Sequence, residues 1–225
     1  MKKYNLLNQK KIFRKVITRS DNKELYRKNA LKFDIEYFDG AREEGYGGYS
    51  YDGRWVPVAR RIIKKWNLKA GDRLLDIGCA KGFLLEDLYR ILPGLSLHGI
   101  DISIYAKSKA NPIIKDSIQI FDCNNDLPYG DNSFDAVFAI NTIHNLSLEK
   151  CKNAIREIER VCPGRGFIQV DAYRTEAERA VFLDWMLTAK TFDTPEGWKK
   201  IFEECGYTGY YYWTIIESAC VEEEF

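Results

Sequence analysis

The sequence predicts an α/β fold: a Rossmann-like, doubly wound and mostly parallel sheet of about seven strands with helices on both faces, plus an N-terminal extension of helix and loop. Three observations support this class. From residue 73 onward, short apolar runs alternate with segments of helical periodicity, as in parallel sheets covered on both faces. A glycine-containing turn joins the first apolar run to the first of these helical segments. A length of 225 residues suits one domain with an appendage.

The N-terminal extension is strongly basic. Residues 1–30 contain ten Lys or Arg and two acids, and apolar residues at 6, 7, 12, 13, 16 and 17 form a partial helical stripe. We expect an amphipathic helix or arm that packs on the main body, because charge runs usually mark solvated faces. An arm that contacts phosphate is the alternative. Residues from 34 to 55 mix glycine and tyrosine with charges and lack a period, which indicates a loop.

The main domain follows, and its first helix is expected over 58–66 from apolar residues at helical spacing. Strands are expected at 73–77, 95–100, 117–121, 134–140 and 166–170, and a long aromatic strand at 207–216 that could pair with an antiparallel neighbour. Helices are expected at 83–92, 104–109, 148–161, 176–187 and 195–204.

Composition and charge argue against several classes of protein. The formal net charge of +1 gives no general attraction to nucleic acid or to an anionic membrane. No apolar run approaches the roughly 18 residues of a membrane span, and the first residues lack the apolar core of a signal peptide. Six cysteines are scattered without a C-x-x-C pair or a histidine at metal spacing. We therefore expect reduced thiols, no metal site and a cytoplasmic location.

The turn after the first strand, in LLDIGCAKGFLLEDL (74–88), has the chemistry of a ligand site. Glycine lets the backbone approach a ligand closely, and the following helix begins with free N–H groups. The turn reads D-x-G-x-A-x-G, with Asp76 ahead of Gly78 and Gly82, instead of the G-x-G-x-x-G of a dinucleotide site. A carboxylate is a poor neighbour for pyrophosphate, so the turn favours a ligand that carries a positive charge.

Two further acids end the next two strands. Asp101 could accept both hydroxyls of a ribose, and Asp122 with its adjacent backbone could reach an adenine edge. The segment LPYGDNSFD (127–135) then leads into the fourth strand. In this order, the four features resemble the class I S-adenosylmethionine-dependent methyltransferases over roughly residues 55–217. A glycine turn needed only for helix packing would leave the three strand-end acids to chance.

The resemblance implies S-adenosylmethionine as cofactor, S-adenosylhomocysteine as product, and a methyltransferase domain at 55–225 that follows a basic arm and a lid at 1–54. It places Asp76 near the amino group of the cofactor, Asp101 at the ribose, and Asn141 near the methionine portion and the methyl group. The chain departs from the family at Ala80, where glycine is usual, although an alanine methyl is a small perturbation. The full set of expected cofactor residues is Tyr49, Asp76, Gly78, Cys79, Ala80, Gly82, Phe83, Asp101, Ile102, Asp122, Cys123 and Asn141.

The acceptor side is expected after strands four and five. His144 lies three residues past Asn141 and could act as the general base, or it could only hold the loop by hydrogen bonding. The run AINTIHNL (139–146) lacks the Asn/Asp-Pro-Pro-aromatic pattern typical of base-nitrogen methylation. Asp171, Tyr173 and Arg174 follow strand five and could meet the acceptor, although capping or surface pairing explains them nearly as well.

The glycine-tyrosine loop GYGGYSYDGRW (45–55) is expected to cover the methionine end of the cofactor, since aromatic faces suit a sulfonium cation. With the preceding EYFDG, it resembles a subgroup of small bacterial methyltransferases in surface-polysaccharide and nucleotide-activated precursor pathways. That resemblance implies small, polar and often phosphate-bearing acceptors. The residues expected to contact the acceptor are Arg42, Tyr46, Arg54, Trp55, Tyr173 and Arg174.

The sequence therefore predicts methyl transfer to an oxygen of a small polar metabolite, such as a sugar or a nucleotide-activated surface-polysaccharide precursor. Two alternatives remain open at this point: an RNA methyltransferase that uses the basic arm, and a cofactor-binding protein without catalysis. Against RNA, the body outside residues 1–30 is net acidic. A monomer or homodimer is expected, without a nucleic-acid or membrane partner.

Overall fold

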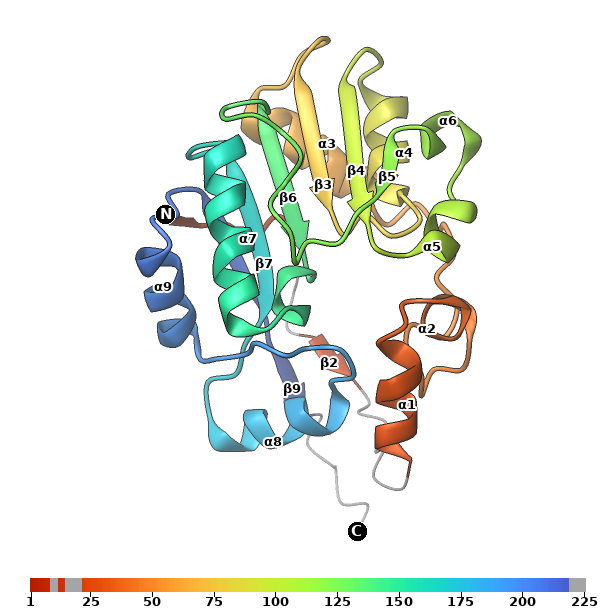
Figure 1. Cartoon of the computed structure of the whole chain (residues 1–225), viewed down its shortest axis with the longest axis vertical. Coiled ribbons are helices and arrows are strands. Elements are labelled where there is room, and N and C mark those ends of the chain that lie inside the picture. Colours follow the sequence, from red (N-terminus) through yellow and green to blue (C-terminus); the bar gives the residue numbers. More distant parts are fainter. Residues whose placement is uncertain (9–11, 15–21, 219–225) are drawn as a thin grey trace.

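The computed structural model describes residues 1–8, 12–14 and 22–218. Its centre is a seven-stranded sheet in the order β1-β8-β7-β6-β3-β4-β5, and every neighbouring pair of these strands is parallel (Figure 1). The strands are β1 (Lys2–Lys3), β3 (Arg73–Ile77), β4 (Ser96–Asp101), β5 (Ile118–Ile120), β6 (Ala136–Ile140), β7 (Gly166–Asp171) and β8 (Tyr210–Thr214). The predicted doubly wound fold is confirmed.

Helices cover both faces of this sheet. The main-domain helices are α3 (Val56–Trp66), α4 (Phe83–Ile91), α5 (Ile104–Ser108), α6 (Pro112–Lys115), α7 (Leu148–Val161), α8 (Glu176–Trp185) and α9 (Pro195–Glu204). Apolar side chains of α3, α4 and α6 pack in one buried cluster, and those of α7 and α9 pack in the other. The strands supply both clusters alternately: Leu74 lies in the first and Leu75 in the second.

The order of the strands places the ligand edge. The chain steps from β3 through β4 to β5 in one direction and from β6 through β7 to β8 in the other. The switch between β3 and β6 opens a crevice at their carboxyl ends, where open α/β sheets bind ligands. Figure 1 shows α1 (Lys23–Ala30) and α2 (Ile35–Asp39) just beyond these ends.

The last strand differs from its prediction. β8 begins at Tyr210 rather than 207, because Gly206 adopts φ 68° and residues 206–209 turn the chain out of α9. No antiparallel neighbour appears in the described part of the chain. Instead, β8 pairs in parallel with β7 on one side and with β1 on the other.

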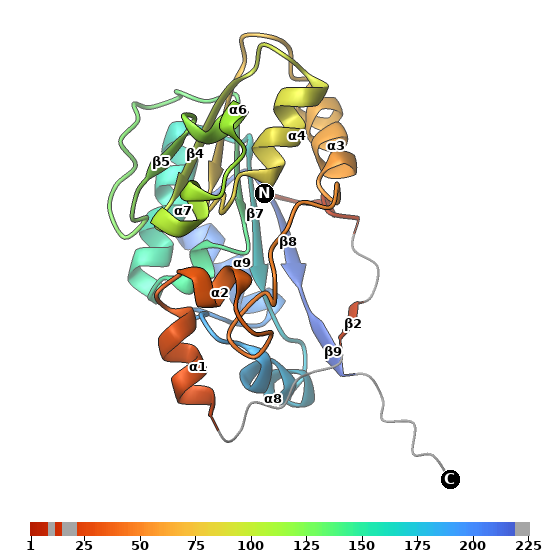
Figure 2. The same ribbon diagram turned by 90° about the vertical axis from the view of Figure 1, so that its right-hand side faces the viewer.

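The predicted helical stripe within residues 1–30 is also wrong where the structure describes it. Lys2–Lys3 extend the main sheet as β1, and β2 (Ile12–Arg14) pairs in parallel with β9 (Ile216–Ser218), as Figure 2 shows from the side. Strand pairing satisfies backbone groups at the open edge of β8, a gain that helical periodicity cannot reveal. Residues 9–11 and 15–21, which include Val16 and Ile17 of the stripe, lie outside the described residues.

The predicted loop from residue 34 contains a short helix, α2. Asp34 opens it by accepting a hydrogen bond from the Ile35 N–H at 2.8 Å. Residues 40–55, which we call the lid, follow α2 without regular structure up to the start of α3. Within the described ranges, the structure has no helix both long and apolar enough to span a membrane.

Candidate active site

Three neighbouring cavities lie at the carboxyl ends of the strands, and we name each after one of its polar residues. The Asp101 chamber, the Asp76 chamber and the His144 chamber all include Tyr46 and Asn141 in their walls. Asn141 follows β6, and Tyr46 comes from the lid. The two residues therefore mark the junction at which a group in one chamber can meet a group in another.

Asn141 is held in an uncommon conformation at this junction. Its φ is 54°, in the left-handed region that asparagine tolerates better than most residues. Its N–H donates to the carbonyl of Gln169 at 2.9 Å, and its Oδ1 accepts from the Thr214 hydroxyl at 3.0 Å. These contacts from β7 and β8 hold the side chain in place and offset the strain.

The Asp101 chamber gathers many of the expected cofactor residues. Asp101 is 8% exposed, and its two oxygens accept the N–H groups of Ala80 at 2.7 Å and Ser103 at 2.8 Å. Burial raises the pKa of Asp101, and the backbone hydrogen bonds oppose that rise. The acid thus ties the turn after β3 to the turn after β4. Expected residues in the walls are Gly78, Ala80, Asp101, Ile102, Asp122, Cys123 and Asn141.

The Asp76 chamber is built around a buried carboxylate. Asp76 is 5% exposed, and its carboxylate accepts no hydrogen bond from any described residue. Burial, with a smaller contribution from the charge of Asp101, raises the pKa of Asp76 to about 7. Such a group fits the ammonium of the cofactor's methionine portion, which would supply the missing counter-charge. The walls also contain four residues expected at the cofactor, Tyr49, Gly78, Cys79 and Ala80, and two expected at the acceptor, Arg54 and Trp55.

Packing also explains why glycine occupies positions 78 and 82 of the turn. A Cβ on Gly78, at φ 74°, would lie 2.2 Å from the Thr142 hydroxyl oxygen. A Cβ on Gly82, at φ 75°, would lie 2.6 Å from the Ile114 Cδ1. Gly82 and Phe83 begin α4 and line none of the three chambers. The positive φ and the close contacts therefore favour glycine at 78 and 82 even before a ligand is considered.

Ala80, the departure from the family pattern, has φ 50°. Left-handed backbone costs an alanine roughly 1–2 kcal/mol, whereas glycine loses roughly 0.5–1 kcal/mol through its freer unfolded state. We expect Ala80→Gly to leave the free energy of unfolding unchanged or to raise it by up to about 1 kcal/mol. Urea unfolding measures this. A loss of stability larger than about 1 kcal/mol would contradict the assignment of strain to Ala80.

His144 and Asp171 form a buried pair in the third chamber. His144 lies in the 3₁₀ turn η1 (Ile143–Asn145), and Asp171 ends β7. His144 Nε2 is 3.4 Å from Asp171 Oδ2, and the Asp171 N–H donates to His144 Nδ1 at 3.4 Å. Burial lowers the pKa of His144, and the charge of Asp171 opposes that change. The ring is therefore neutral near pH 7 and able to accept a proton.

The three arginines expected to contact the acceptor do not line a common chamber. Arg42 lines the His144 chamber, but it donates to the carbonyls of Gly45 at 2.7 Å and Tyr46 at 3.1 Å. Arg54 lines the Asp76 chamber and pairs with Asp52 at 2.6 Å. Arg174 pairs with Glu178 on α8. Neither Arg174 nor Tyr173 lines any of the three chambers, so their contact with the acceptor stays a prediction.

Two walls of the site were not predicted from the sequence. The segment from α1 to α2 supplies apolar and aromatic side chains to the Asp101 chamber, namely Leu31, Phe33, Tyr37 and Phe38. The segment around the end of α8 supplies the His144 chamber with Trp185, Met186, Leu187, Thr188 and Ala189. The aromatic residues of DIEYF were the available signal for the first wall. The second lies in a segment without a motif.

Comparison with known protein families agrees with this geometry. Residues 75–170 match the family model described as "Methyltransferase domain". YrhH of Bacillus subtilis (strain 168), whose name classes it with the methyltransferases, is 29% identical over 128 residues, which cover 54% of this chain and 70% of YrhH. The tRNA (carboxymethyluridine(34)-5-O)-methyltransferase of Arabidopsis thaliana is 32% identical over 132 residues. That match covers 56% of this chain but only 29% of the plant enzyme.

Solved structures share the fold. A chain from the complex of the Haloferax volcanii Trm112 methyltransferase activator with a methyltransferase-class partner superposes with a TM-score of 0.55. The superposition covers 86% of this chain and 77% of that one, at 16% sequence identity. Identity this low carries the fold and not the substrate or the partner.

Proposed function

We propose that this chain, as a class I S-adenosylmethionine-dependent methyltransferase, methylates a hydroxyl oxygen of a small polar metabolite. The observation that carries the proposal is the His144–Asp171 pair, which lies in the chamber that shares Asn141 and Tyr46 with both cofactor chambers. A hydroxyl must lose its proton as it is methylated, so a neutral histidine beside the junction suits an oxygen acceptor.

Separate residues of the chain would bind the cofactor and accept the proton. The bound cofactor supplies an electrophilic methyl group on a sulfonium. Asp76 would hold the ammonium, and Asp101 the ribose hydroxyls. His144 would accept the proton of the acceptor hydroxyl at Nδ1, which gives up its 3.4 Å contact with the Asp171 N–H, while the Nε2–H keeps its contact with Asp171 Oδ2. The Asp171 carboxylate then stabilises the imidazolium, as the acid does in other His–Asp pairs.

The walls of the His144 chamber favour an uncharged ring as the acceptor. Tyr37, Tyr46 and Trp185 offer aromatic faces, while His144, Asp171 and Thr214 offer polar groups. A sugar ring has both an apolar face and hydroxyls, so it matches this lining. Arg42, Arg54 and Arg174 are dispersed, and of the three only Arg42 lines this chamber. A phosphate of a nucleotide-activated precursor would therefore pair mainly with Arg42. The five cysteines among the described residues, Cys79, Cys123, Cys151, Cys162 and Cys205, are free, which supports the expected cytoplasmic location.

A second candidate is oxygen methylation of a tRNA base. The similarity to the plant tRNA methyltransferase favours it, since that enzyme is also named for transfer to oxygen. The basic residues of the extension could contact RNA phosphates, although residues 9–11 and 15–21 lie outside the described structure.

A transfer assay distinguishes these candidates. The protein is incubated with methyl-labelled S-adenosylmethionine and with either a small-metabolite fraction or total tRNA from the same extract. We expect label in sugar-containing metabolites, bound through an ether that survives mild base. Label only in tRNA, with a rate that falls steeply with salt, would overturn the small-molecule proposal.

A further inference from the structure

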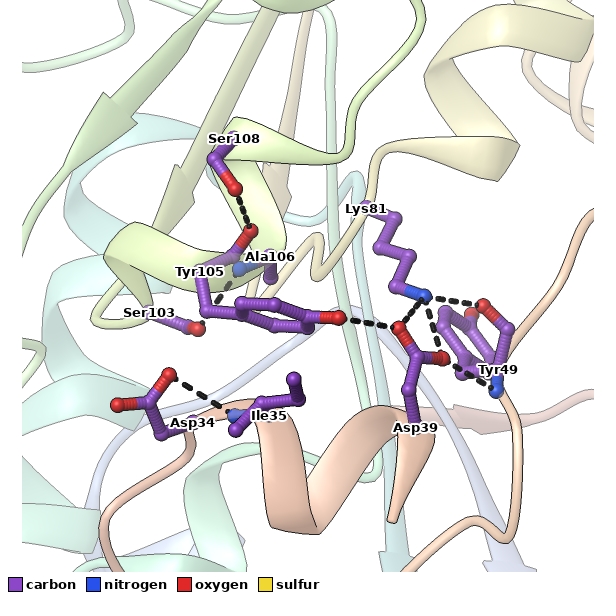
Figure 3. A network of polar contacts seen from close by, with 9 residues as sticks. All are labelled: Asp34, Ile35, Asp39, Tyr49, Lys81, Ser103, Tyr105, Ala106 and Ser108. Carbon is purple, nitrogen blue, oxygen red and sulfur yellow. Dashed lines mark hydrogen bonds and ion pairs between the residues drawn. The ribbon is translucent and has the colours of Figure 1, made fainter.

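A compact polar cluster joins the lid to the cofactor turn at residues 78–82 (Figure 3). Lys81 Nζ donates to Asp39 Oδ1, to Asp39 Oδ2 and to the Tyr49 carbonyl, each at 2.7 Å. Asp39 is the last residue of α2. It also accepts the Tyr105 hydroxyl at 2.7 Å and the Tyr49 N–H at 3.1 Å. The cluster thus draws together α2, the lid, the cofactor turn and α5.

Lys81 is fully satisfied in this cluster. An ammonium has three N–H donors, and each meets one oxygen here. The Lys81 side chain is 7% exposed and that of Asp39 is 30% exposed. A buried ammonium is costly unless it is paired and hydrogen-bonded, so Lys81 strongly favours the arrangement in which Asp39 and Tyr49 are both in place. Lys81 lines none of the three chambers, so the cluster acts through its neighbours.

The aromatic residues of the lid depend on this anchor. The Tyr49 ring packs on Phe83 of α4 at a centroid distance of 4.9 Å and on Tyr46 at 4.6 Å. Tyr46 lines all three chambers. Further along the lid, the Tyr51 hydroxyl donates to Asp87 of α4 at 2.6 Å. Moving the lid away from the junction therefore requires release of Tyr49 from Lys81 and Asp39.

We propose that Asp39 and Lys81 form a latch that couples lid closure to the shape of the cofactor turn. Both are positioning residues, because they act through Tyr46 and Tyr49 rather than through contact with the reacting groups. Closed, the latch sets Tyr46 at the junction and shields the Asp76 chamber from water. Open, it frees the lid, and the cofactor can exchange. The inference does not depend on which acceptor is methylated.

A double-mutant cycle on cofactor release tests the coupling. S-adenosylhomocysteine is released from the full-length protein in a stopped-flow experiment that follows tryptophan fluorescence, since Trp55 lines the Asp76 chamber. Lys81→Met and Asp39→Asn should each speed release by roughly tenfold, and the double variant should release no faster than the faster single variant. Lys152→Met is the matched control, because it removes a pair with Glu204 at 2.9 Å between α7 and α9, and neither helix lines any of the three chambers. Its release rate should stay within about twofold of the wild type.

Limited proteolysis separates the latch from a general loss of stability. Trypsin should cut faster at Arg42 and Arg54 in the lid of Lys81→Met, with cutting at Arg174 unchanged. Should Lys81→Met not fold, Tyr105→Phe removes one hydrogen bond to Asp39 and should speed release by roughly two- to threefold. Any of three results would overturn the proposal. The effects of the two substitutions on the release rate could multiply in the double variant, the release rate could stay unchanged, or the rate of cutting could rise equally at all three arginines.

Discussion

Replacing His144 with glutamine is expected to lower the rate of methyl transfer by roughly 100-fold or more, while the affinity for S-adenosylmethionine changes by less than about threefold. Glutamine keeps the approximate size and the hydrogen bonding of histidine, but it cannot accept the proton. His144 lines a chamber separate from Asp76 and Asp101, so cofactor contacts should survive. Single-turnover rates at saturating acceptor, together with calorimetry, measure the two quantities.

The pH profile of the same variant is the sharper readout. Burial lowers the pKa of His144 below its ordinary value of 6.5, so the wild-type base is neutral at pH 7 and becomes protonated only under more acidic conditions. At saturating cofactor, where the pH dependence of binding through Asp76 does not affect the rate, the wild-type rate should therefore fall on the acid side of neutrality, and this limb should be absent in His144→Gln. Asp171→Asn should keep the limb but shift it to lower pH, because the opposing negative charge is gone. A wild-type rate and an unchanged profile in His144→Gln would rule out the general-base role.

Replacing Asp76 with asparagine is expected to weaken cofactor binding by roughly 30-fold or more, because a buried charge-assisted contact with the ammonium is lost. The same substitution is expected to stabilise the cofactor-free protein, although it weakens cofactor binding. The folded pKa of Asp76 is about 7, above its ordinary value of 3.8. In the cofactor-free protein, its contribution to stability is thus fully present below about pH 4 and is lost as pH rises through 7.

Asp76→Asn should therefore leave the cofactor-free protein more stable than the wild type at pH 8, by roughly 2–4 kcal/mol, with the advantage vanishing near pH 4. Wild-type cofactor affinity should rise as pH increases through 7, and the variant should lack this dependence. Denaturant unfolding and calorimetry at pH 5, 7 and 8 provide both data sets. Asp116→Asn, an exposed residue that follows α6, is the matched control. Equal stability of Asp76→Asn and wild type at pH 8 would show that the buried charge of Asp76 does not destabilise the folded protein.

The regular part of the fold could be predicted from local pattern. The bounds of β3, α7 and α9 agree with the sequence to the residue, because buried strands, amphipathic faces and the Thr194 cap leave periodic signals. The strand-end acids could be placed for the same reason: once the sheet is parallel, residues that end neighbouring strands share an edge. Asp76 and Asp101 both lie at this edge, and the charge of Asp101 contributes to the raised pKa of Asp76.

The features that the sequence did not predict depend on contacts between residues that are far apart in the chain. β1 forms only because β8, about 200 residues later, leaves an edge open to it. The partner of His144 is Asp171, which was expected as an acceptor contact, since nothing in the sequence shows that the two side chains face each other. No pattern in the sequence gives Lys81 a role, and only the folded α2 reveals the carboxylate that it contacts 42 residues away. Pairs of this kind follow from tertiary packing and leave no local period.

Titration of the full-length protein with S-adenosylmethionine in a calorimeter is the most direct test of the central claim that the junction of the three chambers is a methyl-donor site. We predict one site per chain with roughly micromolar affinity, and weaker binding in Asp76→Asn at pH 8. The absence of any binding heat at millimolar cofactor, confirmed by equilibrium dialysis, would contradict it.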